Sequence, residues 1–268
     1  MCETCGCTIT PANAHLVQAQ GKLERTADGK ASVEVLAGLL HENDHQAGHN
    51  REHFNRHGVL AINLMSAPGS GKTSLLESTI EALGGELSIA VIEGDLETEN
   101  DAQRIRAHGV PAVQVTTGQA CHLDAHMVHD ALHAMDLDGV DLLFIENVGN
   151  LVCPASFDLG HHANVTLLSV TEGDDKPAKY PVMFRAADLV LLSKADFLDM
   201  IDDFDPGKAA RHVRELANPA EVLTVSVRRA GSLQPWFDWL RATLAAHRAG
   251  VALNPRTQPD SAALHSAG

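Results

Sequence analysis

Short apolar runs alternate with longer segments of helical pattern from residue 59 to residue 249. The runs have the length of buried strands, and several of the segments between them are long enough for helices. This alternation predicts an α/β fold with a mostly parallel central sheet flanked by helices on both faces. Strands are predicted at residues 59–65, 87–93, 112–116, 141–147, 164–170, 189–193 and 221–225. Helices are predicted at residues 72–83, 101–107, 122–135, 206–217 and 233–247.

The regions outside this domain, which is predicted to span residues 58–249, differ from it in composition. Residues 1–40 form an extension with a flexible, cysteine-rich tip, and apolar positions alternate around Val33 and Val35. Residues 41–57 are polar and rich in His, and they predict a linker that becomes a helix near residues 50–56. Residues 250–268 are rich in Pro, Ser and Ala, which is typical of a disordered tail.

The charge balance limits the classes of partner. The chain of 268 residues has 20 Lys and Arg against 35 Asp and Glu, a net charge of −15. Such a charge argues against general binding to nucleic acid or to an anionic membrane. No apolar stretch approaches the roughly 20 residues that a bilayer span needs. The N-terminus lacks the basic start and apolar run of a signal peptide, so a cytoplasmic location is expected.

The clearest motif is a glycine-rich loop between the predicted strand 59–65 and the predicted helix 72–83. Glycines let the backbone wrap closely around phosphates, and the N–H groups at a helix start supply positive potential. Lys72 would reach the β- and γ-phosphates, and the Thr73 hydroxyl would ligate Mg²⁺. Ser66 stands where the usual P-loop pattern begins with Gly. The predicted nucleotide-binding residues here are Pro68, Gly69, Ser70, Gly71, Lys72, Thr73 and Ser74.

Two carboxylates mark the ends of predicted strands. Asp95 comes just after the strand at 87–93, and Glu146 lies at the end of an apolar run. Because ligands of open α/β sheets bind at the carboxyl ends of the strands, both should face the phosphates. Either would hold Mg²⁺, directly or through water, or orient the attacking water. We therefore predict Lys72, Asp95 and Glu146 as catalytic residues, and Thr73, Asp95 and Glu146 as the Mg²⁺ site.

A further motif, Ser193-Lys194-Ala195-Asp196, follows another apolar strand and is similar to the N/T-K-x-D guanine motif. The Asp196 carboxylate can accept hydrogen bonds from both N1–H and the 2-amino group of guanine. Adenine offers neither donor, so a site built on this carboxylate can strongly prefer guanine. Lys194 and Asp196 are therefore predicted to bind the base, with Ser226 as a further contact.

Cysteine and histidine supply candidate metal sites. Cys2, Cys5 and Cys7 offer three thiolates on a short strip, which suits Ni²⁺, Zn²⁺ or Cu⁺. A second, incomplete tetrahedral set comes from loops predicted at the carboxyl edge of the sheet, and water or a second subunit would complete it. Its members are Cys121, His122 and Cys153.

Histidines also recur at helical spacing. One set falls at residues 41, 45, 49, 53 and 57, and another at 122, 126, 129 and 133. Weak metal buffering is one interpretation of the first set. Solvated helix faces are favoured for both sets, because acidic neighbours are plentiful.

With these motifs, the chain resembles the hydrogenase nickel-incorporation GTPases (HypB) over nearly its whole length. Besides the cysteine tip, the phosphate loop and the base motif, three segments carry the resemblance. They are Glu93-Gly94-Asp95-Leu96-x-Thr98-x-x-Asp101-Ala102, Gly118-x-x-Cys121-His122-Leu123-Asp124, and Ile145-Glu146-Asn147-Val148-Gly149-Asn150-Leu151-x-Cys153-Pro154.

The resemblance implies a GTPase of the SIMIBI class that dimerises with GTP and helps deliver Ni²⁺ to the hydrogenase large subunit, with a HypA-type protein as partner. It implies a tight nickel site at Cys2, Cys5 and Cys7, and a weaker Ni²⁺ or Zn²⁺ site at Cys121, His122 and Cys153. Residues 171–177 resemble a nucleotide-sensing switch in which Lys176 is the charged contact.

Two departures from the family are visible. The usual Ser-Ala-Lys base loop reads Ser226-Val227-Arg228, and long polyhistidine tracts are reduced to the spaced set at 41–57.

Two alternatives stay open. One is a urease-type nickel-insertion GTPase, although the metal motif of that relative is a compact Cys-Pro-His rather than a separated Cys-His and Cys. The other is a metal-buffering protein with a regulatory nucleotide site.

Overall fold

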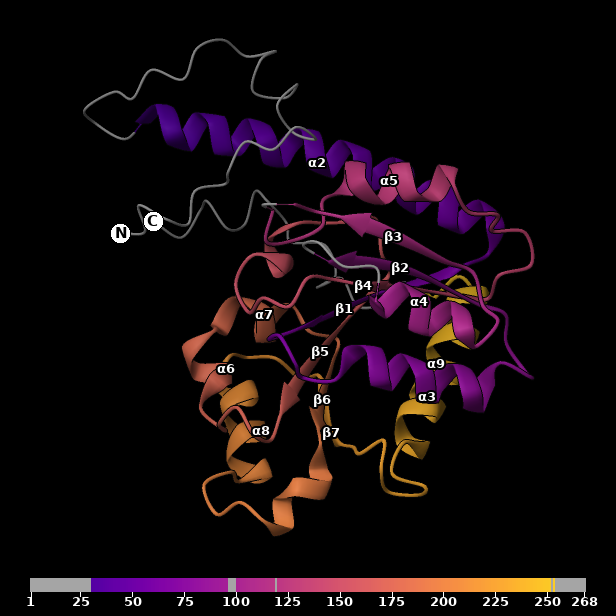
Figure 1. Ribbon diagram of the computed structural model, residues 1–268. Coiled ribbons are helices and arrows are strands. Elements are labelled where there is room, and N and C mark those ends of the chain that lie inside the picture. Colours follow the sequence, from indigo (N-terminus) through magenta and orange to yellow (C-terminus); the bar gives the residue numbers. More distant parts are fainter. Residues whose placement is uncertain (1–29, 96–99, 119, 252, 254–268) are drawn as a thin grey trace.

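The computed structural model describes residues 30–95, 100–118, 120–251 and 253, with only the backbone of residues 30–39 (Figure 1). Its described part contains a seven-stranded sheet in the order β3-β2-β4-β1-β5-β6-β7, and every pair of neighbouring strands is parallel. The predicted parallel sheet is therefore confirmed. The strands are β1 (Leu60–Ser66), β2 (Ile89–Asp95), β3 (Ala112–Thr116), β4 (Leu142–Glu146), β5 (Ala163–Ser169), β6 (Leu189–Ser193) and β7 (Glu221–Thr224).

The helices that surround this sheet follow the order of the chain. They are α2 (Lys30–His57), α3 (Lys72–Leu83), α4 (Asn100–Ala107), α5 (Ala125–His133), α6 (Lys176–Lys179), α7 (Pro181–Ala186), α8 (Pro206–Glu215) and α9 (Gln234–Arg248). Two short 3-10 turns, η1 (Pro154–Ser156) and η2 (Ala195–Asp199), follow β4 and β6.

Both faces of the sheet are covered by helices, because alternate residues of the central strands point to opposite sides. On one face, Ile62 of β1 shares a core with α3, α4 and α9, in which Trp236 is the largest fully buried side chain. On the other face the core comes from α2, α5, α7 and α8, and it includes Phe54 and Phe184. The predicted helices on both faces are therefore confirmed.

Helix α2 is longer than the short helix predicted at residues 50–56, and it includes the polar stretch that was predicted as a linker. Its buried residues in the described part are Asn43, Ala47, Asn50 and Phe54, which lie on one stripe of helical spacing. Two of these four residues are asparagines, so a pattern of apolar positions alone does not reveal the stripe.

Helix α5 begins at Ala125, later than predicted, because the Asp124 side chain caps it by accepting a hydrogen bond from the Met127 N–H at 2.8 Å. Cys121 and His122 therefore lie in the loop before the helix. In the described part of the chain, no helix is long and apolar enough to cross a membrane.

A buried histidine joins three elements near the start of β5. His162 Nδ1 accepts a hydrogen bond from the Ala61 N–H at 3.0 Å, so Nε2 carries the proton and donates to Asn55 Oδ1 at 3.1 Å. Burial, followed by the charges of His247 and His161, lowers the pKa of His162 to about 3. The folded chain thus holds this ring in its neutral form.

We expect His162→Gln to reduce the loss of stability on acidification. Between pH 6.5 and about 3, the unfolded chain binds a proton at this ring that the folded chain excludes, so His162 lowers the free energy of unfolding as pH falls. At pH 5, His162 lowers the free energy of unfolding by about 2 kcal/mol, because this pH lies roughly 1.5 units below the unfolded pKa and each unit is worth about 1.36 kcal/mol. Urea unfolding at pH 7 and pH 5 measures it, with the exposed His133→Gln as control. An unchanged pH dependence in His162→Gln would refute this.

Candidate nucleotide and metal site

The phosphate loop connects β1 to α3. Gly69 and Gly71 have φ of 74° and 97°, a left-handed conformation that favours glycine. Ser66 lies outside that region, so its position does not require the Gly of the usual pattern. Its hydroxyl instead accepts a hydrogen bond from Lys72 Nζ at 3.1 Å. A side chain at Gly149, in the loop after β4, would come within 2.7 Å of Pro68 Cα, so these two loops are in direct contact.

Buried carboxylates lie beside this loop. Thr73 Oγ1 donates to Glu146 Oε1 at 2.9 Å, and the register of β2 and β4 places Glu93 opposite Glu146. Burial raises the pKa of Glu146 to about 7, and burial followed by repulsion from Glu146 raises that of Glu93 to about 8. One oxygen of each carboxylate has no hydrogen-bond partner. Asp95, at the end of β2, adds negative charge that acts on Glu93.

This arrangement fits a divalent cation. Carboxylate and hydroxyl oxygens are the ligands that Mg²⁺ prefers, and a cation would stabilise the charged form of these buried groups. The structure thus brings the predicted Thr73 and Glu146 together, and Asp95 lies on the neighbouring strand. Glu93 was not among the predicted site residues. Its place at the end of an apolar strand, two residues before Asp95, is the signal that would have revealed it.

The base motif lies directly against the phosphate loop. Ser193 Oγ donates to the Ser70 carbonyl at 2.7 Å. The Asp196 carboxylate accepts from Ser226 Oγ at 2.6 Å, and Arg228 Nη1 lies 3.8 Å from its other oxygen. The hydrogen bond from Ser226 lowers the pKa of Asp196, so the carboxylate is ionised and able to accept hydrogen bonds from a base. Lys194 precedes it with a φ of 58°.

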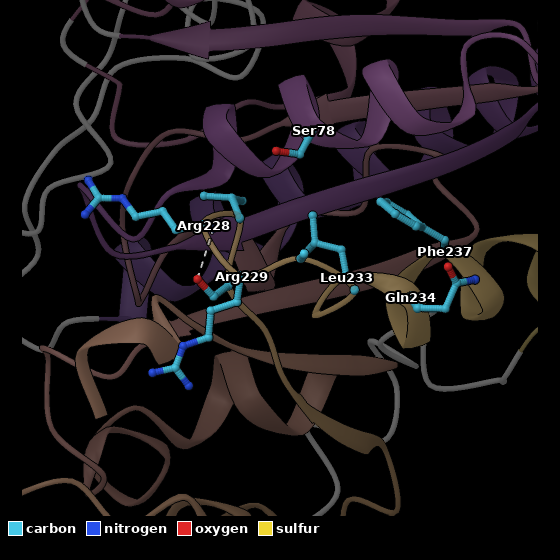
Figure 2. A pocket seen from close by; sticks show the side chains of 10 residues that line it. Ser78, Arg228, Arg229, Leu233, Gln234 and Phe237 are labelled. Carbon is cyan, nitrogen blue, oxygen red and sulfur yellow. Dashed lines mark hydrogen bonds between the residues drawn. The ribbon is translucent and has the colours of Figure 1, made fainter. Parts of the chain in front are cut away.

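A pocket of about 290 Å³ lies beside the base loop. Figure 2 shows Ser78 of α3 on one side and Leu233, Gln234 and Phe237 on another, while the Arg228 and Arg229 guanidinium groups point away from them. Ser226 lines this pocket and also contacts Asp196, so the pocket adjoins the predicted base site.

Cys121, His122 and Cys153 come together from two loops. One potential ligand atom from each lies within 4.8 Å of the others, and Cys121 Sγ is 3.6 Å from His122 Nδ1. The His122 ring stacks on Phe157 with centroids 4.0 Å apart. Burial lowers the pKa of His122, which favours the neutral imidazole that binds metals. Two sulfurs and one nitrogen fit a tetrahedral Ni²⁺ or Zn²⁺ site with one open position. Cys2, Cys5 and Cys7 lie outside the described residues.

The strand order explains why these loops meet. β3 and β4 are both neighbours of β2, so the loops after them, which carry Cys121 and Cys153, leave the same edge of the sheet. Asn147 connects them, because its Oδ1 accepts from the Leu123 N–H at 3.1 Å. Asn147 directly follows Glu146, so the metal loops and the predicted Mg²⁺ site share one short segment.

Two buried asparagines of α2 support the same loops. Asn43 Oδ1 accepts from the Ala125 N–H at 2.9 Å, and Asn43 Nδ2 donates to the Asp158 carbonyl at 2.8 Å. Asn50 Nδ2 donates to the carbonyls of Ala125 at 2.8 Å and Leu159 at 3.1 Å. Helix α2 therefore connects the segment after His122 to the segment after Cys153. These residues were not predicted as part of the site.

We expect Asn50→Ala to weaken metal binding at Cys121, His122 and Cys153 without removing a ligand. Two buried carbonyls would lose their donor, at a cost of about 1–3 kcal/mol in stability. Loss of an outer support for ligating residues typically costs about 10–100-fold in metal affinity. Nickel titration and urea unfolding measure both effects, with the exposed Glu52→Ala as control. Metal affinity equal to that of the parent would show that α2 does not position the loops.

The segment at residues 171–177 contacts the phosphate loop through Glu172. Glu172 Oε1 accepts from Ser70 Oγ at 2.6 Å and from the Ser169 N–H at 3.1 Å. Lys176, which is predicted as the charged contact of this switch, has its Nζ 5.3 Å from the centre of the Tyr180 ring.

Residues 60–224 match the family model described as CobW/HypB/UreG, nucleotide-binding domain. This match, the parallel sheet and the glycine-rich loop define the class of protein as a P-loop nucleotide-binding protein. The chain is 51% identical over 217 residues to the hydrogenase maturation factor HypB of Rhizobium leguminosarum bv. viciae, a match that covers 81% of this chain and 72% of the relative. It is 52% identical over 225 residues to HypB of Azotobacter vinelandii, with coverages of 82% and 74%.

A solved structure gives the same result. HypB from Helicobacter pylori in complex with nickel has a TM-score of 0.74 and 40% identity, and the match covers 80% of this chain and 98% of that one. The chain belongs to the HypB family of hydrogenase maturation factors.

Proposed function

We propose that the chain is a GTP-hydrolysing nickel metallochaperone that assists nickel insertion into the hydrogenase large subunit. The observation that carries the proposal is the shared segment between the two sites: Glu146 contacts Thr73, and the adjacent Asn147 contacts the loop of Cys121 and His122. A nucleotide at the phosphate loop and a metal at the cysteines would therefore act on the same few residues.

The phosphate chemistry rests on Lys72 and the start of α3. Lys72 and the helix N-terminus stabilise the negative charge of the β- and γ-phosphates as water attacks the γ-phosphate in line. Thr73 with Glu146 or Asp95 would hold Mg²⁺, which would neutralise further phosphate charge. Asp95 and Glu146 are the two candidates for orienting the attacking water.

Nickel is the cargo of the proposed cycle. Cys121, His122 and Cys153 form the weaker Ni²⁺ or Zn²⁺ site, and water or a second subunit completes its coordination. Cys2, Cys5 and Cys7 form the tighter site. GTP-dependent dimerisation, a HypA-type accessory protein and the hydrogenase large-subunit precursor complete the proposed set of partners.

We expect Asp196→Asn to abolish most of the preference for guanine nucleotides. One carboxylate acceptor becomes an amide donor that faces a donor of the base, while the hydrogen bond from Ser226 holds the side chain in place. A site built on hydrogen bonds loses about 10⁴–10⁵ in discrimination when they are unmatched. The preference is measured by the competition of GTP or ATP with a fluorescent guanine nucleotide for the site. Equal binding of GTP and ATP by the parent chain would overturn the GTPase proposal, and GTP hydrolysis with Mg²⁺ separates it from a metal buffer.

A further inference from the structure

Two histidine series that are distant in the sequence lie on one surface. Helix α2 packs along α5, and Figure 1 shows them side by side. Burial lowers the pKa of His53 in α2, and the charges of His57, Arg56, His129 and His133 lower it further. His129 and His133 belong to α5, so the two series are close enough to interact across the helix pair.

The α5 pair has the spacing of two ligands on one ion. His129 Nε2 and His133 Nε2 are 3.1 Å apart. Two nitrogens that each lie about 2.0–2.1 Å from an ion are about 2.8–3.4 Å apart at octahedral or tetrahedral angles. His129 is half-buried and His133 is exposed, so an ion can reach them from solvent.

The His53 and His57 pair of α2 is arranged differently. Its rings are tilted at 53° with centroids 4.7 Å apart, and His57 Nδ1 is 3.1 Å from Asp138 Oδ1. His57 is therefore engaged with a carboxylate, whereas the His129 and His133 rings contact each other.

We propose that His129 and His133 of α5 form a surface site for a divalent transition metal ion such as Ni²⁺ or Zn²⁺. Imidazole nitrogens suit these ions, and a histidine pair at i and i+4 places both rings on one face of a helix. The site contains no thiolate and is distinct from Cys121, His122 and Cys153. It does not depend on the proposed GTPase function.

The test is a titration of the full chain with Ni²⁺ alone, followed by equilibrium dialysis and ultraviolet absorption. His129→Gln/His133→Gln should bind one Ni²⁺ fewer per chain, while the charge-transfer absorption from the cysteine sites is unchanged. The matched control is His108→Gln/His212→Gln, which removes two histidines that lie beside glutamates elsewhere on the surface. It should bind as the parent does.

Gln is a good helix former, so both substitutions in α5 should preserve the helix. Equal stoichiometry and affinity in His129→Gln/His133→Gln and the parent would overturn the site.

Discussion

Lys72→Ala is expected to lower GTP hydrolysis by about hundredfold or more, which corresponds to roughly 2.7 kcal/mol of barrier. Lys72 is buried at the start of α3, where its Nζ contacts Ser66 at the mouth of the phosphate loop. Within that loop it is the side chain that we propose to supply positive charge to the γ-phosphate. Phosphate release with saturating GTP and Mg²⁺ measures the effect.

The matched control is Lys179→Ala, which removes an exposed lysine paired with Asp175 on the surface. We expect this variant to hydrolyse GTP at the rate of the parent. Urea unfolding of Lys72→Ala confirms that the variant is folded. Hydrolysis by folded Lys72→Ala within about threefold of the parent, roughly 0.7 kcal/mol of barrier, would contradict the role of the phosphate loop.

The sheet was predictable from the sequence because its central strands are buried on both faces and appear as continuous apolar runs. Once the strands were placed, their carboxyl ends brought Thr73, Glu146 and the loops of Cys121 and Cys153 to one edge. The roles of these residues as ligands stay predictions.

Other features depend on contacts that a linear pattern does not contain. The α2 stripe is hidden because Asn43 and Asn50 are buried for their hydrogen bonds to loops distant in the sequence. Glu93 gains its importance from the register that places it opposite Glu146. Pairing across the sheet and between helices, rather than local periodicity, decides both cases.

The second large effect concerns coupling between the nucleotide and the metal. Glu146, Asn147 and the loop of Cys121 form a short path from Thr73 in the phosphate loop to the proposed metal ligands. If GTP-driven dimerisation completes the coordination, GTP must raise metal affinity, and metal must favour the GTP state by the same free energy. We expect a coupling of about 1–3 kcal/mol, or about 5–150-fold in affinity.

Cys121→Ala should erase this coupling while leaving GTP binding nearly unchanged, because Cys121 is exposed in its loop and Thr73, Lys72 and Asp196 are retained. Thiolates and imidazole must lose protons before they bind metal, so the coupling should weaken as pH falls below neutrality. A Cys121→Ala variant with the full coupling would show that the nucleotide acts on metal binding elsewhere in the chain.

The most direct test of this coupling is the Ni²⁺ affinity of the chain in which Cys2, Cys5 and Cys7 are changed to Ser. This affinity is measured once with GDP and once with a non-hydrolysable GTP analogue, with the oligomeric state recorded in both. We predict that the GTP analogue raises Ni²⁺ affinity by about 5–150-fold. Identical affinities in the two nucleotide states, with dimerisation confirmed, would contradict the claim that the metal loops respond to the nucleotide.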